Sequence, residues 1–181
     1  MGHGRYPPTL CEFPNSLCST YSRGTLNVSP PCRQIFGPNL HEVDKPEKLN
    51  TSSKRWYELF FKPVFSEKEL YFAGNWVDVR DVAEAHVAAL EKEEAANERI
   101  LVAAGAVADQ EFIEAAKRVA VPLGIKGVQT GIKDYDPTQV KQSVIYNPEK
   151  RERILGIKMT SVDDSVRDSI ADFQKRGWIN A

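Results

Sequence analysis

The sequence predicts an α/β fold in which helices connect parallel strands, and three consecutive segments carry this prediction. Trp76 to Val79 is a short apolar run rich in strand-forming residues. Apolar residues then recur at helical spacing, and an unbroken apolar run follows from Ile100 to Ala104 and ends at Gly105. A strand, a helix and a second buried strand in this order favour a parallel sheet with a helical crossover. The positions on the predicted helix face are Val82, Ala85, His86, Ala89 and Leu90.

Helix-capping residues mark where the central helix and the helices after it begin. Asp78 and Asp81 stand at N-cap and N3 spacing, so their carboxylates suit the first turn of the central helix. Further helices are predicted from Asp109, from Asn147 and Pro148 to Leu155, and from Ser161 onward, and a short strand is predicted over Ser143 to Tyr146.

The segment before the central strand contains one strand, one helix and two loops. Thr25 to Ser29 is a plausible buried strand that ends at Pro30 and Pro31, which cannot donate to a strand ladder. Asn50, Thr51 and Ser52 offer N-cap chemistry to a helix that runs through Trp56, Leu59 and Phe60. Residues 39–49 and Lys62 to Gly74 are predicted loops.

The first 24 residues show neither helical nor strand periodicity and contain three prolines, so we predict an irregular or disordered N-terminus followed by one domain, residues 25–181. The chain has an odd number of cysteines, at positions that match no zinc motif. Free thiols are the simplest interpretation, with an incidental disulfide or a metal ligand as alternatives. The cysteines are Cys11, Cys18 and Cys32.

Composition excludes several classes of function. The 181 residues are 41% hydrophobic and 27% charged, which is typical of a soluble chain. A net charge of −1 provides no basic surface for nucleic acid or an anionic membrane. No apolar run is long enough to span a bilayer, and the first ten residues lack the apolar core of a signal peptide. We therefore expect a cytoplasmic protein with neither nucleic acid nor membrane as partner.

Several segments, in a consistent order, resemble the extended short-chain dehydrogenase/reductases, a family within the epimerase/dehydratase superfamily. The branch that fits best contains dihydroflavonol reductase, cinnamoyl-CoA reductase and the fungal aldehyde and ketone reductases. The resemblance covers roughly residues 25 to 180 and corresponds to the C-terminal half of the family. The segments are SPPCRQIFGPNLHEV, LNTSS, VDVRDVAEAHVAALE with RILVAAG, and LGIKMTSVDDSVRDSI with the closing RGW.

This resemblance implies the C-terminal part of a Rossmann-like parallel sheet plus a small, mostly helical substrate lobe. It also implies four contacts with an NADP or NAD cofactor, from Pro30, Pro31, Ile35 and Ser52. Here Ser29 replaces the family's usual Asn, and the connection to Phe36 is about two residues longer than usual. The residues alone have a simpler interpretation, in which the prolines end a strand and Ser52 caps a helix.

Two parts needed for hydride transfer are absent from this sequence. The glycines at 124, 127 and 131 have the wrong spacing for a dinucleotide-binding turn, and no strand precedes them. Reductases of this family use a Tyr and a Lys four residues later on one helix face as general acid. Tyr146 and Lys150 have that spacing, but Asn147 and Pro148 separate the Tyr from the helix. We therefore assign no catalytic residue.

Other polar residues have structural interpretations. Asp78, Arg80 and Asp81 could form a catalytic carboxylate group, but capping and an Arg80–Glu84 ion pair explain them more simply. His86 is expected as a hydrogen-bonded core residue on the apolar helix face, and no set of three metal ligands is evident.

The function that we predict is that of an NAD(P)H-dependent oxidoreductase that reduces small aldehydes or ketones, NADP being favoured by analogy with the branch. The chain is expected to be truncated and inactive alone, because it lacks the glycine turn and the Tyr–Lys pair. The alternative is a non-catalytic module that pairs with a full-length reductase. An exposed sheet edge would then support a homo- or heterodimer.

Overall fold

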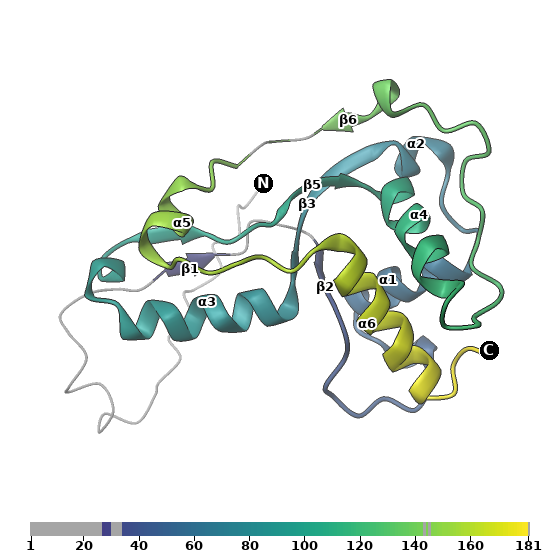
Figure 1. The fold of residues 1–181 in the computed structure, drawn as a ribbon, viewed down its shortest axis with the longest axis horizontal. Coiled ribbons are helices and arrows are strands. Elements are labelled where there is room, and N and C mark those ends of the chain that lie inside the picture. Colours follow the sequence, from purple (N-terminus) through teal and green to yellow (C-terminus); the bar gives the residue numbers. More distant parts are fainter. Residues whose placement is uncertain (1–26, 30–33, 143, 145, 181) are drawn as a thin grey trace, which may run out of the picture.

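The structure is a computed structural model that describes residues 27–29, 34–142, 144 and 146–180 (Figure 1). The predictions for residues 1–24, for the three cysteines, and for Pro30 and Pro31 lie outside these residues. In chain order the strands and α-helices are β1 (Asn27–Ser29), β2 (Gln34–Phe36), α1 (Thr51–Phe61), α2 (Glu67–Leu70), β3 (Phe72–Asp78), α3 (Val79–Glu91), β4 (Arg99–Leu101), β5 (Gly105–Ala108), α4 (Asp109–Ala120), β6 (Lys141–Gln142), α5 (Glu149–Ile154) and α6 (Val162–Lys175).

The strands form two sheets. β1 and β4 make a parallel pair in which Val28 lies opposite Ile100. The larger sheet is mixed and is centred on β3, which is parallel to β2 and β6 and antiparallel to β5. The α/β class is therefore as predicted.

The predicted crossover, however, connects two sheets and not two strands of one sheet. β3 and β4, the strands on either side of α3, have different partners, because β3 pairs with β2 and β4 pairs with β1. Periodicity identifies the type of an element but does not specify its neighbour in a sheet, which depends on contacts far along the chain.

Adjacent residues of β3 face two separate hydrophobic cores, because successive side chains of a strand point to opposite sides. Trp76 packs in the larger core with α1, α4 and α6, whereas Val77 packs in a smaller core with α3, β4 and α5. Figure 1 shows these groups of helices at opposite ends of the molecule, with β3 between them.

Aromatic side chains dominate the larger core. Trp56 of α1 stacks on Phe36 with ring centroids 4.1 Å apart, and it meets the edge of Phe112 of α4 at 5.0 Å. Its indole Nε1–H donates to Ser169 Oγ of α6 over 2.9 Å, so the buried polar atom of this side chain has a partner. Trp56 thus joins β2, α1, α4 and α6.

Local capping signals located most helix starts correctly. Asn50, Asp78 and Ser161 are the N-caps of α1, α3 and α6, and each side chain accepts a backbone N–H of the first turn. One prediction in the loops was wrong, because Lys62 to Gly74 contains α2 and the start of β3. The strand predicted over Ser143 to Tyr146 lies partly outside the described residues, and the nearest described strand is β6.

Within the described residues, no helix is both long and apolar enough to cross a membrane.

The Trp56→Ala substitution tests the larger core. Trp56 is fully buried, so we expect a loss of about 3–5 kcal/mol in the free energy of unfolding, measured by urea denaturation and circular dichroism. Val121→Ala is the control, because Val121 is 80% exposed and its loss should change stability by about 0.5 kcal/mol or less. Equal midpoints for the two variants would contradict this account of the core.

Candidate functional site

A pocket of about 450 Å³ opens beyond the C-terminal ends of β2 and β3, where α1 and α3 begin. Ligands of parallel α/β sheets bind at this end of the strands, and helix N-termini favour negatively charged or polar groups there. The pocket is within the size range of small-molecule sites. Its lining residues are Ile35, Phe36, Gly37, Pro38, Asn39, Leu40, His41, Asn50, Ser52, Ser53 and Val79.

Two of the four predicted cofactor contacts, Ile35 and Ser52, line this pocket together. The other two, Pro30 and Pro31, lie outside the described residues. Ser52 also belongs to the first turn of α1, and its hydroxyl donates to the Oδ1 atom of the N-cap Asn50 over 3.2 Å. Ser52 is therefore both part of a helix start, as the simpler interpretation had it, and part of the pocket wall.

Leu40, His41 and Val79 also line the pocket, although none of them was predicted as a site residue. Leu40 and His41 follow the Gly37–Pro38 turn after one intervening residue, and Val79 directly follows the N-cap of α3. Their positions beside these two turns were the only signal in the sequence.

The turn that shapes the pocket requires glycine at position 37. Gly37 has a φ angle of +133°, which L-residues with a side chain rarely adopt. A Cβ atom there would lie 2.9 Å from Val79 Cγ1 and 3.2 Å from Asp78 Oδ2. The turn after β2 therefore packs directly on the junction between β3 and α3.

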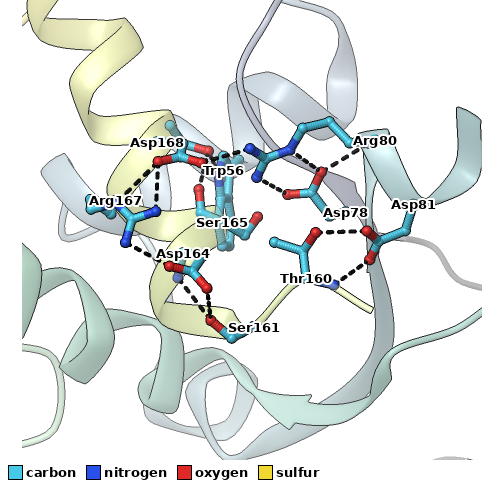
Figure 2. A network of polar contacts seen from close by, with 11 residues as sticks. Trp56, Asp78, Arg80, Asp81, Thr160, Ser161, Asp164, Ser165, Arg167 and Asp168 are labelled. Atoms are coloured by element: carbon cyan, nitrogen blue, oxygen red, sulfur yellow. Dashed lines mark hydrogen bonds and ion pairs between the residues drawn. The ribbon is translucent and has the colours of Figure 1, made fainter. Parts of the chain in front are cut away.

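Asp78 forms the base of this junction (Figure 2). Its fully buried carboxylate accepts the Arg80 backbone N–H and the Arg80 side-chain Nε–H and Nη2–H, each over 2.9 Å. Arg80 Nη1 reaches Asp168 of α6 over 2.6 Å. The predicted Arg80–Glu84 pair is wrong, because Arg80 is held by Asp78 and by a residue distant in sequence.

The electrostatics of Asp78 follow from these contacts. Burial alone would raise the pKa of its carboxyl group, but the hydrogen bonds and charge of Arg80 outweigh burial and bring the pKa below the ordinary value of 3.8. Asp78 is therefore ionised at neutral pH, and its carboxylate is hydrogen-bonded to Arg80. The carboxylate of Asp81 accepts the Thr160 backbone N–H over 2.9 Å and the Thr160 hydroxyl over 2.6 Å. Both carboxylates therefore have structural roles.

A third buried carboxylate, Asp109, lies outside the pocket, as Asp78 and Asp81 do. It pairs with Arg55 of α1 and accepts Gln34 Nε2–H over 3.3 Å. Burial raises the pKa of Asp109, and the charge of Arg55 opposes this increase. Asp109 was predicted to cap α4, but it is the first residue of that helix, after the N-cap Ala108.

The remaining candidates show no catalytic arrangement. Tyr146 precedes α5, whereas Lys150 belongs to that helix and pairs with Glu98 over 2.7 Å. His86 was expected in the core, but it is exposed and its Nδ1 lies 2.7 Å from the Val82 carbonyl oxygen. In the part of the chain that the structure describes, no group of three His, Cys, Asp or Glu residues could hold a metal ion.

The chain is similar to part of several NADPH-dependent reductases. No family model matches the chain. The Candida albicans protein GRP2, which carries a provisional assignment as an NADPH-dependent methylglyoxal reductase, is 30% identical over 150 residues, which are 81% of this chain and 42% of that protein. The NADPH-dependent methylglyoxal reductase GRE2 of Saccharomyces cerevisiae is 25% identical over 142 residues, 78% of this chain and 41% of that protein.

A solved structure agrees with the sequence comparisons. The crystal structure of Candida albicans Gre2 with NADPH superposes with a TM-score of 0.62 and 28% identity, covering 84% of this chain and 44% of that one. The chain is similar to these reductases over most of its own length. It spans about two fifths of the length of the curated relatives that it matches. This similarity confirms the resemblance drawn from the sequence segments.

Asp78→Asn tests the ion pair beside the pocket. The amide can still cap α3 but removes the charge that binds Arg80, so we expect a loss of about 2 kcal/mol of stability at pH 7. The folded-state pKa of Asp78 lies below its unfolded value of 3.8, so the ionised form stabilises the fold above pH 3.8.

That contribution is lost as the pH falls through the folded-state pKa. The stability difference between the parent chain and Asp78→Asn should therefore shrink below pH 3.8, as measured by urea denaturation at a series of pH values. A difference that is independent of pH would contradict the assignment. Glu84→Gln, which changes a charge on the same helix without an Arg80 contact, is the control.

Proposed function

We propose that this chain forms the nicotinamide- and substrate-side portion of an NADPH-dependent reductase of small aldehydes or ketones. The observation that carries the proposal is the placement of Ile35 and Ser52 in one pocket, beside the Phe36–Gly37–Pro38 turn. Relatives named as NADPH-dependent methylglyoxal reductases make NADPH the preferred cofactor and small aldehydes the preferred substrates.

The chemistry of the pocket fits one end of such a cofactor. Ile35, Phe36 and Val79 offer apolar surface suited to the flat face of a nicotinamide ring, and Asn50 and Ser52 offer hydrogen-bonding groups suited to its ribose or carboxamide. The pocket volume of about 450 Å³ suits the nicotinamide end and is too small for a whole dinucleotide. Bound NADPH would supply a hydride to the carbonyl carbon of the substrate.

The residues of this chain shape the pocket and exclude water from it. Gly37 lets the turn after β2 lie against Asp78 and Val79, and Asp78 is fixed by Arg80. The wall formed by Ile35, Phe36 and Val79 removes water from one side of the pocket, which strengthens electrostatic interactions inside it. The proton donor expected of the family, a Tyr with a Lys four residues later on one helix, has no counterpart in this sequence.

The 181-residue chain by itself should not oxidise NADPH in the presence of methylglyoxal. The reason is chemical: the sequence contains neither a glycine-rich dinucleotide turn nor a Tyr–Lys pair on one helix. The measurement is the absorbance of NADPH at saturating aldehyde, with the intact yeast GRE2 enzyme as positive control. Turnover that follows the purified chain through gel filtration would refute this expectation.

A chimaera tests the pocket directly. The N-terminal part of Candida albicans Gre2, joined to residues 25–181 in place of its own matching part, should reduce methylglyoxal with NADPH. Ser52→Ala in this chimaera should raise the KM for NADPH about fivefold, because one hydrogen bond of about 1 kcal/mol is lost.

Ser66→Ala is the matched control, because Ser66 also starts a helix, α2, but does not line the pocket. Its KM for NADPH should equal that of the unmodified chimaera. An inactive chimaera that is folded, or equal effects of the two serine substitutions, would contradict the proposed function.

The second candidate is the non-catalytic module that pairs with another reductase polypeptide. Among the described strands, β1 pairs only with β4, and a further strand on its other edge is what this candidate requires.

A further inference from the structure

Another pocket, of about 460 Å³, lies between β4 and α5 and shares no lining residue with the pocket at Gly37. Four of its lining residues are cationic and one is acidic, which gives the lining a net charge of +3, although the whole chain carries −1. We call it the arginine pocket. Its lining residues are Arg99, Leu101, Asn147, Glu149, Lys150, Arg151 and Arg153.

Strand β4 contributes one charged and one apolar residue to this pocket. Ile100 is fully buried in the smaller core, and successive side chains of a strand point to opposite sides. Arg99 and Leu101 therefore face away from that core, and both line the arginine pocket. The pocket thus has an apolar wall beside its positive charges.

Two of the four cations have no counterion in the part of the chain that the structure describes. Neither Arg99 nor Arg153 takes part in an ion pair there, whereas the other two cations pair with glutamates outside the pocket lining. Glu149 precedes Arg153 by four residues, a spacing that allows ion pairs on a helix surface, but the two are not paired. Two exposed guanidinium groups therefore border the pocket without a carboxylate partner.

A third guanidinium group, that of Arg151, is fixed in the pocket wall. Its side chain is only 7% exposed, and it donates to the Ala103 carbonyl oxygen and pairs with Glu152 over 2.9 Å. Its Nε atom is buried and has no hydrogen-bond partner among the described residues. Buried donors are nearly always paired, so an unsatisfied one indicates a bound water or ion. The wall therefore contains a rigid cation and a donor that protein groups leave unsatisfied.

From these observations we propose that the arginine pocket binds the phosphate group of a small organic phosphate ester. The planar guanidinium group donates two parallel hydrogen bonds to phosphate oxygens, and its charge does not titrate. Two guanidinium groups without counterions match the charge of a phosphate monoester, about −1.5 to −2 at pH 7, better than that of a single carboxylate. Leu101 and Asn147 offer apolar and polar surface to the organic part of the ester. This site does not rest on the proposed function.

The test is isothermal titration calorimetry of the 181-residue chain with phenyl phosphate, a phosphate ester whose ring suits Leu101. A one-to-one complex is expected. Arg153→Gln should weaken it about tenfold, because one charge-assisted contact with the phosphate is lost. Arg118→Gln is the matched control, because it removes the same charge from an exposed side chain of α4, at the opposite end of the molecule from α5 (Figure 1).

Glu149→Gln should change the affinity in the opposite direction. Glu149 is the single acidic residue of the lining, and its carboxylate repels a phosphate group. Its neutralisation should therefore tighten the complex about threefold. A charged helix surface that binds no ligand would show neither this gain nor the loss in Arg153→Gln.

Each result decides the matter, with circular dichroism showing that the variants are folded. No binding at millimolar phenyl phosphate, or equal weakening by Arg153→Gln and Arg118→Gln, would overturn the proposal. Inorganic phosphate that binds as tightly as phenyl phosphate would overturn the ester in favour of free phosphate. Phenyl sulfate, a monoanion of similar shape, should bind less tightly, and equal affinity would overturn the match to a doubly charged group. Weakening by Arg153→Gln alone, together with tightening by Glu149→Gln, would support the site.

Discussion

The ion pair between Asp78 and Arg80 is the interaction on which the rest of the arrangement depends. A fully buried carboxylate is unfavourable unless its oxygens are occupied, and Arg80 with the backbone of the first turn of α3 occupies them. The same guanidinium reaches Asp168 and so attaches α6. Gly37 packs against Asp78, so the position of the turn that lines the pocket depends on this ion pair.

Strand β3 explains how such a small chain maintains two hydrophobic cores. Trp76 and Val77 face opposite cores, and the next residue, Asp78, ends the strand and starts α3. The pocket lies where the two cores meet, at the ends of two parallel strands and the beginnings of two helices. Rigid elements thus surround the candidate site, while the turn at Gly37 and the segment at Leu40 shape its opening.

The sequence predicted helix caps correctly but did not predict contacts between residues far apart in the chain. The caps at Asn50, Asp78 and Ser161 were found because a capping residue and its partners lie within one turn. The sheet partner of β3 and the Arg80–Asp168 contact were missed because they join residues far apart in sequence. His86 was placed in the core because an apolar pattern cannot distinguish a face covered by this chain from the face that remains exposed. Ile35 and Ser52 came from the family resemblance, since periodicity has no signal for a pocket.

The β1–β4 pair has a consequence for the order of folding. Asn27 lies opposite Arg99, and β2, α1, α2, β3 and α3 all lie between them along the chain. Closing so long a loop is entropically unfavourable until the intervening segment is compact. We expect the aromatic core around Trp56 to form before β1 and β4 meet, and this strand pair to be among the first parts to open in the native state. The small sheet thus depends for its stability on the segment that its two strands enclose.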